Sequence, residues 1–146
     1  MLKKIKLDIE SVITNLDDLG VPDGDPEINR TSHVGAMRTS NDETVFSYKE
    51  SNENGSISCS VTVRGESVSV RREGAICSVM VFDTGEPYKT VYSIPPYSFD
   101  MVITTKKLEI SLSERGGKID ILYTMDVGGA KKSTRMRITA SEVQIK

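Results

Sequence analysis

Apolar and polar side chains alternate along most of this chain, and turns rich in glycine interrupt the alternation at intervals of about 8 to 12 residues. The segments Ile57–Val63 and Ile119–Val127 show the pattern most clearly. A period of two places the apolar side chains on one face of an extended strand. Valine and isoleucine total 27 residues against 11 for leucine and alanine, a bias toward residues that suit a pleated sheet. The chain is therefore expected to be all-β, and a helix bundle is excluded.

The alternation and the turn residues predict eleven short strands. They lie near residues 4–13, 28–38, 43–50, 55–64, 66–73, 75–83, 87–94, 98–105, 107–114, 118–127 and 131–141. Short turns between successive strands favour an antiparallel up-and-down meander. An open sheet of this size would leave two exposed edges, so we expect the meander to close into a barrel of about 8–11 strands. The interior of such a barrel is either filled by side chains or holds one small ligand.

Residues 1–146 are expected to form a single β-barrel domain. The longest interruption is an acidic loop at about residues 15–29, which carries five acidic residues and no basic one. Charged residues break the apolar run at the start of the sequence, so no secretory segment is expected. The sequence also lacks an apolar stretch of about 18 residues. We therefore expect a cytoplasmic protein without a membrane partner.

The charge balance argues against a nucleic-acid partner. Lys and Arg total 19 against 21 Asp and Glu, which gives a net charge of -2 and no basic excess to neutralise phosphates. The short basic stretch Lys131–Arg137 is expected to be a solvated strand face. The acidic loop does not have the spacing of a calcium-binding EF-hand loop. We predict no metal site and no cofactor.

Nothing in the sequence predicts catalysis. His33 is the only histidine, and no nucleophile motif accompanies it, so we expect a surface or hydrogen-bonded strand residue. Cys59 and Cys77 are predicted on strands separated by a third strand, which is beyond disulfide reach. We interpret both as reduced, buried side chains, and we expect a protein that is not an enzyme.

Three segments in the second half of the chain carry a family resemblance. They are Arg72-Glu73-Gly74 at a tight turn, Tyr92-Ser93-Ile94-Pro95 followed by the alternation Phe99–Thr105, and Gly117–Tyr123 leading to Gly128. Between Val70 and Met136 the chain resembles the YwiB-like family of uncharacterised bacterial proteins. The resemblance implies a lipocalin-like (calycin-type) β-barrel of one domain. It implies no catalytic residue.

Flexible and aromatic side chains are placed where the barrel walls are expected. The candidate ligand-binding residues are Arg72, Met80, Phe82, Tyr92, Met101, Tyr123 and Met125. Methionine fits irregular apolar shapes and tyrosine adds a polar tip, which suits a small apolar ligand held by Arg72 or Tyr123. The alternative is a filled barrel that acts through its rim or its acidic loop as an interaction or structural module. A homodimer is compatible with either hypothesis.

Overall fold

A computed structural model describes residues 2–53 and 55–143, and within them the chain forms ten strands and no helix. The strands are β1 (Leu2–Leu16), β2 (Glu27–Thr39), β3 (Thr44–Asn52), β4 (Gly55–Arg64), β5 (Ser67–Gly74), β6 (Ser78–Phe82), β7 (Tyr88–Ile94), β8 (Tyr97–Ser113), β9 (Gly116–Val127) and β10 (Ala130–Glu142). The all-β prediction is confirmed. The described part of the chain contains no helix long and apolar enough to cross a membrane.

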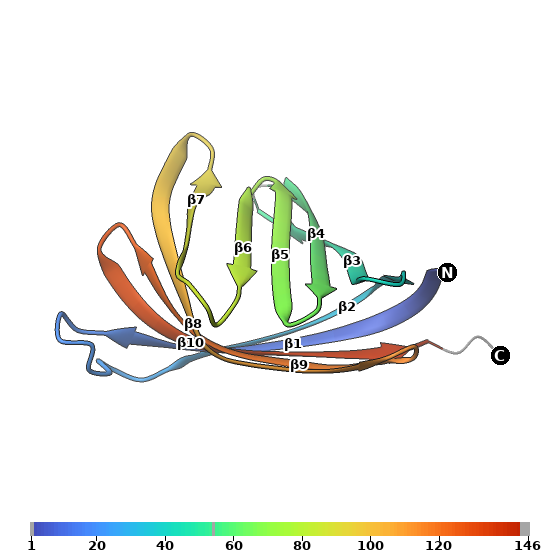
Figure 1. The fold of residues 1–146 in the computed structure, drawn as a ribbon. Helices are drawn as coiled ribbons and strands as arrows, with labels where there is room; N and C mark the ends of the chain where they lie inside the picture. Colours follow the sequence, from blue (N-terminus) through green and yellow to red (C-terminus); the bar gives the residue numbers. More distant parts are fainter. Residues whose placement is uncertain (1, 54, 144–146) are drawn as a thin grey trace.

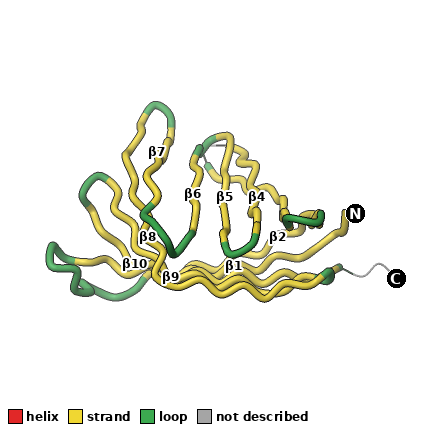
Figure 2. The backbone as a smooth tube through the Cα atoms, in the orientation of Figure 1, coloured by secondary structure: helices red, strands yellow, loops and turns green. Residues whose placement is uncertain are grey.

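The strands form one sheet in the order β6-β5-β4-β3-β2-β1-β10-β9-β8-β7, with antiparallel pairing throughout. Long strands β1, β2, β9 and β10 lie on one side, and the shorter β3 to β7 cross above them (Figures 1 and 2). The two ends of the sheet, β6 and β7, meet through a single bridge between Cys77 and Ser93. Two main-chain hydrogen bonds of 2.8 and 2.9 Å form it. The predicted antiparallel meander is confirmed as a nearly closed barrel.

The eleven predicted strands become ten because two of them are one strand. The segments predicted at 98–105 and 107–114 belong to β8, which pairs with β9 throughout and shifts register between Thr105 and Lys107. The extra residue at this β-bulge reverses the alternation, so that inward positions change from odd to even numbers. In the sequence this reversal looks like the end of one strand and the start of another.

The acidic loop is shorter than predicted. Strand β1 continues to Leu16 and β2 begins at Glu27, so the connection covers residues 17–26. A carboxylate oxygen of Asp17 accepts hydrogen bonds of 2.9 Å from the main-chain N–H groups of Leu19 and Val21. These contacts fold the first half of the loop back on itself, as short polar side chains commonly do in turns.

The hydrophobic core lies between the two sides of the barrel and is built from the inward positions of the strands. The large side chains with almost no exposed surface are Phe46, Phe82, Ile5, Leu7, Met37, Ile57, Met101, Ile103, Ile119, Ile121 and Ile138. Strand β2 passes very close to β3 at Gly35, where a side-chain Cβ would clash with the carbonyl oxygen of Ser47. Only glycine permits this approach. The ladder between β2 and β3 covers residues 36–39 of β2, and over residues 27–35 the two strands are not paired.

Candidate functional site

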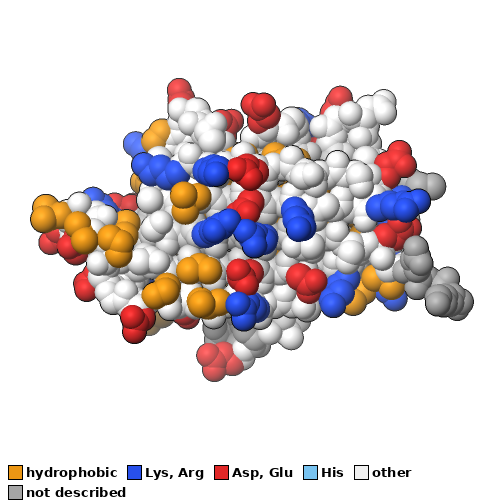
Figure 3. All heavy atoms as spheres, turned by 90° about the horizontal axis from the view of Figure 1, so that it is seen from below, with side chains coloured by type: hydrophobic (Ala, Val, Ile, Leu, Met, Phe, Trp, Pro, Cys, Tyr) orange, Lys and Arg blue, Asp and Glu red, His pale blue; other side chains and the backbone are white. Residues whose placement is uncertain are grey.

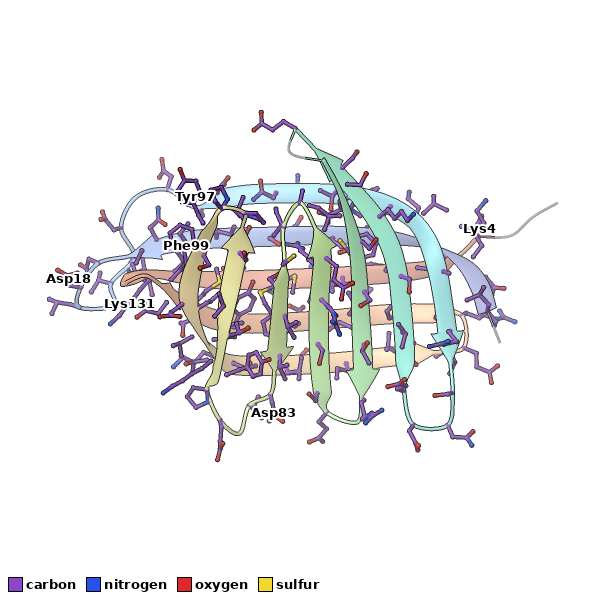
Figure 4. All side chains as sticks on the ribbon, turned by 90° about the horizontal axis from the view of Figure 1, so that it is seen from above. Lys4, Asp18, Asp83, Tyr97, Phe99 and Lys131 are labelled. Atoms are coloured by element: carbon purple, nitrogen blue, oxygen red, sulfur yellow. The ribbon has the colours of Figure 1, made fainter. Side chains whose placement is uncertain are left out.

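The barrel interior is hollow toward one end, with a cavity of about 600 Å³. Its walls include Ile13 of β1, Val127 of β9 and Ala130 of β10, so it lies toward the β1–β2 loop and the β9–β10 turn. Figure 4 locates this end by Asp18 and Lys131, with Lys4 at the opposite end. We call the first the open end and the second the packed end. A volume of this size is typical of a site for a small molecule.

Apolar side chains form the deep part of the cavity. Val61, Val70, Met80, Met136 and Ile138 line it and belong to four strands from both sides of the barrel. They occupy inward positions, as their cross-strand partners show: Val61 pairs with Val70, and Val70 with Met80. Two of them are methionines, whose flexible side chains adapt to irregular shapes. The deep part therefore suits an apolar group.

Polar side chains continue the same inward rows toward the open end. On β3 the row runs from Phe46 through Tyr48 to Glu50, and on β5 it runs from Val70 to Arg72. Tyr48, Glu50 and Arg72 all line the cavity. A charged residue at a position that the alternation directs inward is the signal that sequence reasoning overlooked for Glu50.

Arg72 is the unusual group in this wall. Its Nε atom is buried and makes no hydrogen bond to the described residues. Burial opposes the positive charge and is the largest single influence, but the carboxylate of Glu50 together with Tyr48, Cys59 and Tyr92 outweighs it and raises the pKa of Arg72 above its ordinary value. The guanidinium is therefore charged at neutral pH and offers donors to the cavity. Buried donors of this kind normally have an acceptor.

Glu50 lies nearer to a second basic group. Its Oε1 atom is 3.9 Å from Nε2 of His33, and the His33 ring packs on Tyr48 with ring centroids 4.6 Å apart. The expectation of a surface or hydrogen-bonded His33 is wrong. The side chain is only 15% exposed, and its Nε2 atom is buried without a hydrogen bond to a described residue. His33 points inward because it pairs across β1 with the buried Leu7.

Tyr123 forms the wall opposite these groups. Burial raises the pKa of its hydroxyl, so the side chain stays protonated at neutral pH. It packs against Phe82 with ring centroids 4.7 Å apart. The neighbouring Thr134 has a buried hydroxyl that makes no hydrogen bond to a described residue. This wall therefore presents two hydroxyl groups on an apolar surface.

The structure brings together most of the predicted ligand-binding residues. Those that line the cavity are Arg72, Met80, Tyr92, Met101, Tyr123 and Met125. Phe82 does not line it, because its ring is fully buried behind Tyr123. Whether these residues bind a ligand stays a prediction. Sequence reasoning missed several polar lining residues, namely Ser11, Asn29, Thr31, Tyr48, Glu50, Lys132 and Thr134.

The two cysteines differ from the prediction in one respect. Cys59 on β4 is buried and Cys77 precedes β6, so β5 separates them, and both are free thiols. Cys77 is exposed rather than buried, because it lies at the junction of the two sheet ends. Burial raises the pKa of the Cys59 thiol. Within residues 2–53 and 55–143, no group of three or more His, Cys, Asp or Glu side chains is placed to hold a metal ion.

The basic stretch near the end of the chain divides between the two faces of β10. Lys132 points inward and lines the cavity. Arg135 and Arg137 point outward to the carboxylate of Asp120, at 3.3 and 3.2 Å. The outer surface seen in Figure 3 mixes such positive and negative side chains, with apolar groups between them. The prediction of a solvated strand face holds for the two arginines and is wrong for Lys132.

Together these features define an antiparallel β-barrel of ten strands with a hollow, partly polar open end. Residues 21–138 match the family described as "Domain of unknown function (DUF1934)". The chain belongs to this family.

Two relatives extend the match. Over 124 residues the chain is 28% identical to the "Uncharacterized beta-barrel protein YwiB" of Bacillus subtilis (strain 168), which covers 85% of this chain and 82% of that protein. The solved "Crystal structure of ywiB protein from Bacillus subtilis" superposes with a TM-score of 0.85 at 27% identity, covering 98% of this chain and 94% of that one. The predicted YwiB-like resemblance is confirmed, and it reaches beyond Val70–Met136.

Proposed function

We propose that this protein is a non-enzymatic binding protein that holds a small, largely apolar molecule inside the barrel, with an acidic group of that molecule at Arg72. The cavity of about 600 Å³ carries this proposal, since a filled barrel has no space of that size. Its deep part is apolar and its outer part is polar. An elongated molecule with one polar end matches this distribution.

Arg72 supports an acidic group at the polar end. No carboxylate of the described residues lies within 4.0 Å of its guanidinium nitrogens. The nearby Glu50 has its Oε1 atom 3.9 Å from Nε2 of His33. A guanidinium binds a carboxylate through charge-assisted hydrogen bonds, which are stronger than hydrogen bonds between neutral groups. Tyr48 and Tyr92 line the same part of the cavity and add hydroxyl groups.

Two straight-chain probes test the proposal by isothermal titration calorimetry: dodecanoate, which carries a carboxylate, and dodecan-1-ol, which does not. We expect dodecanoate to bind saturably to the wild-type protein. Arg72→Met is expected to weaken dodecanoate binding about 10- to 100-fold, because a hydrogen bond to a charged group contributes about 1.5–3 kcal/mol. Dodecan-1-ol should bind both proteins with similar affinity.

Arg71→Met is the matched control. Arg71 is the neighbour of Arg72 on β5, points outward and pairs with Glu73 at 2.6 Å. This variant should bind dodecanoate like the wild type. Equal losses in the two variants would refute the role of Arg72. Absence of saturable binding to both probes, together with equal native and denatured masses for gently purified protein, would refute the binding function.

A further inference from the structure

Strand β2 has one edge that is only partly used. Its first edge pairs with β1 from Arg38 to Glu27, but its second edge pairs with β3 only from Ala36 to Thr39. Over residues 27–35 the second edge has no ladder partner in the described part of the chain. Residues 27–32 and 34 are exposed. An unpaired stretch of main-chain N–H and C=O groups therefore faces solvent.

Exposed edges of this kind are templates for another strand, and proteins usually protect them with charges, prolines or bulges. Residues 27–35 contain no proline, and their charged residues are Glu27 and Arg30. The guanidinium of Arg30 is already bound to Glu10 at 2.7 Å. Two outward side chains on this edge are exposed and apolar: Ile28 at 54% and Val34 at 61%. The edge is therefore poorly protected.

We propose that two copies of this chain associate by antiparallel pairing of β2 with β2 about a two-fold axis at Thr31. In this register Ile28 lies opposite Val34 of the partner subunit, and the symmetry repeats the contact. The two exposed apolar side chains of the edge thus cover each other twice. Such a contact uses the same surface on both copies, as the commonest homodimers do. Aliphatic cross-strand pairs stabilise a sheet.

Charge also favours this register. Arg30 lies opposite Ser32 of the partner subunit, and in each copy the Ser32 hydroxyl donates a hydrogen bond of 2.5 Å to the carboxylate of Asp8. Each Arg30 therefore faces a neutral hydroxyl of the other copy, while its guanidinium keeps its own partner Glu10 on β1. The continuous row across the interface reads Glu10, Arg30, Ser32 and Asp8, without two like charges side by side.

The neighbouring registers lack this complementarity. A two-fold axis at Arg30 would place the two Arg30 side chains opposite each other, and like charges in that position destabilise a sheet. A two-fold axis at Ser32 would place Arg30 opposite Val34 and Ile28 opposite Ala36. All three axes pass through a residue and therefore keep the outward side chains of both copies on the same face of the sheet. Of the three, the axis at Thr31 gives the best side-chain pairs.

The dimer would also border the cavity. Asn29 and Thr31 belong to the free edge of β2 and line the cavity wall. Pairing along this edge therefore places the partner's β2 beside that wall. The dimer proposal itself stands on the edge and its side chains, and it holds whether or not a ligand binds.

Sedimentation velocity of the full chain tests the proposal. We expect a concentration-dependent dimer for the wild type. The double variant Ile28→Lys/Val34→Lys places like charges opposite each other twice and should raise the dimer dissociation constant by about 10-fold or more. The variant Ile28→Lys/Val34→Glu places opposite charges in both pairs and should restore the dimer.

The control variant Val91→Lys/Leu122→Lys changes two exposed apolar residues on β7 and β9, away from the β2 edge, and should leave the dimer intact. Circular dichroism verifies that each variant remains folded. A wild-type protein that stays monomeric up to about 100 µM, a concentration well above the Kd of ordinary specific dimers, overturns the proposal. A dimer that Ile28→Lys/Val34→Lys does not weaken, or that Ile28→Lys/Val34→Glu does not restore, overturns it as well.

Discussion

The two ends of the barrel interior are built on the same strands and filled in different ways. At the packed end the inward positions carry Ile5, Phe46 and Ile119, which have no exposed surface. At the open end, inward positions of β3 and β5 carry Glu50 and Arg72 beside a cavity. The backbone pattern does not change between them. What changes is the kind of side chain that follows the same alternation.

This difference separates stability from binding. Apolar burial contributes roughly 25 cal/mol for each Å² removed from water, and the packed end supplies most of it. The open end places a charged guanidinium where it lacks a close carboxylate partner. Burial opposes this charge, and the nearby carboxylate of Glu50 helps to compensate it. The packed end is thus expected to supply most of the stability, and the open end to leave a charged donor available for binding.

Truncation of an aromatic ring at each end gives the largest expected contrast. Phe46→Ala should lower the free energy of unfolding by about 3–5 kcal/mol, because it opens a void in a fully packed region. Tyr92→Ala, at the half-buried wall of the cavity, should lower it by less than about 1.5 kcal/mol. Urea unfolding followed by circular dichroism measures both. Equal losses would show that the open end is as tightly packed as the other.

A second prediction concerns Gly35, which lies next to Ala36, the first residue of β2 that pairs with β3. Gly35→Ala should lower the free energy of unfolding by about 2 kcal/mol, because the new methyl group meets a main-chain carbonyl. Gly85→Ala is the control, since its new methyl group would approach only the movable carboxylate of Asp83. The same urea titration compares them. If Gly35→Ala costs no more than Gly85→Ala, the close approach of the two strands is not rigid.

A third prediction compares the two neighbouring arginines of β5. Arg72→Met should lower the free energy of unfolding by about 1 kcal/mol in ligand-free protein, because the raised pKa of Arg72 indicates that the fold favours its charge, and the substitution leaves the carboxylate of Glu50 without it. Arg71→Met, on the outward face, should change it by less than about 0.5 kcal/mol. Thermal and urea unfolding provide the values. No loss of stability in Arg72→Met would mean that Glu50 does not compensate the burial of the guanidinium.

The smallest expected effect concerns charges outside the barrel. Partial burial pushes the pKa of Asp120 up, but hydrogen bonds from Arg135 and Arg137 outweigh it and lower the pKa below the ordinary value. A lowered pKa in the folded state stabilises the protein above the unfolded-state pKa of about 3.9, and this stabilisation is lost as the pH falls. Asp120→Asn should therefore cost less than about 1 kcal/mol at pH 7.

Urea unfolding at a series of pH values measures this contribution. The difference between wild type and Asp120→Asn should disappear as the pH falls from about 4 toward about 2. Glu10 is expected to behave in the same direction, since its hydrogen bond with Arg30 lowers its pKa. A difference that stays constant over this range would mean that the amide substitution acts through packing rather than through charge.

The alternation made the fold predictable, and its interruptions account for most errors. Rows such as Ile57–Val63 specify which side chains face inward, and the structure agrees. Lys106 breaks the alternation inside β8, and a sequence alone does not distinguish a β-bulge from a turn at that point. His33 lies in the inward row of β2, but the polar residues Thr31 and Ser32 before it give no apolar alternation from which its direction could be predicted.

Part of the cavity lining was predictable from the sequence, but the existence of a cavity was not. Met80, Met101 and Tyr123 suit a filled interior as well as a hollow one, because the same side chains pack in both. The hollow lies beside Asn29 and Thr31, on the part of β2 that has no ladder to β3, and the alternation does not predict where two neighbouring strands separate. Phe82 shows that an inward direction alone does not place a residue in the cavity lining, since its ring faces inward as expected and lies behind Tyr123.

One ladder described above has a consequence for how the chain reaches its final state. Among the described ladders, β1 with β10 joins strands distant in sequence, such as Ile5 with Glu142, whereas the others join chain neighbours. Nearby strands can associate early, but contacts between distant segments are slow because a long loop must close first. During synthesis, which proceeds from the amino terminus, the first strand has to wait with an unused edge until the tenth emerges from the ribosome. A growing strip of hairpins becomes a ring only after translation has reached β10.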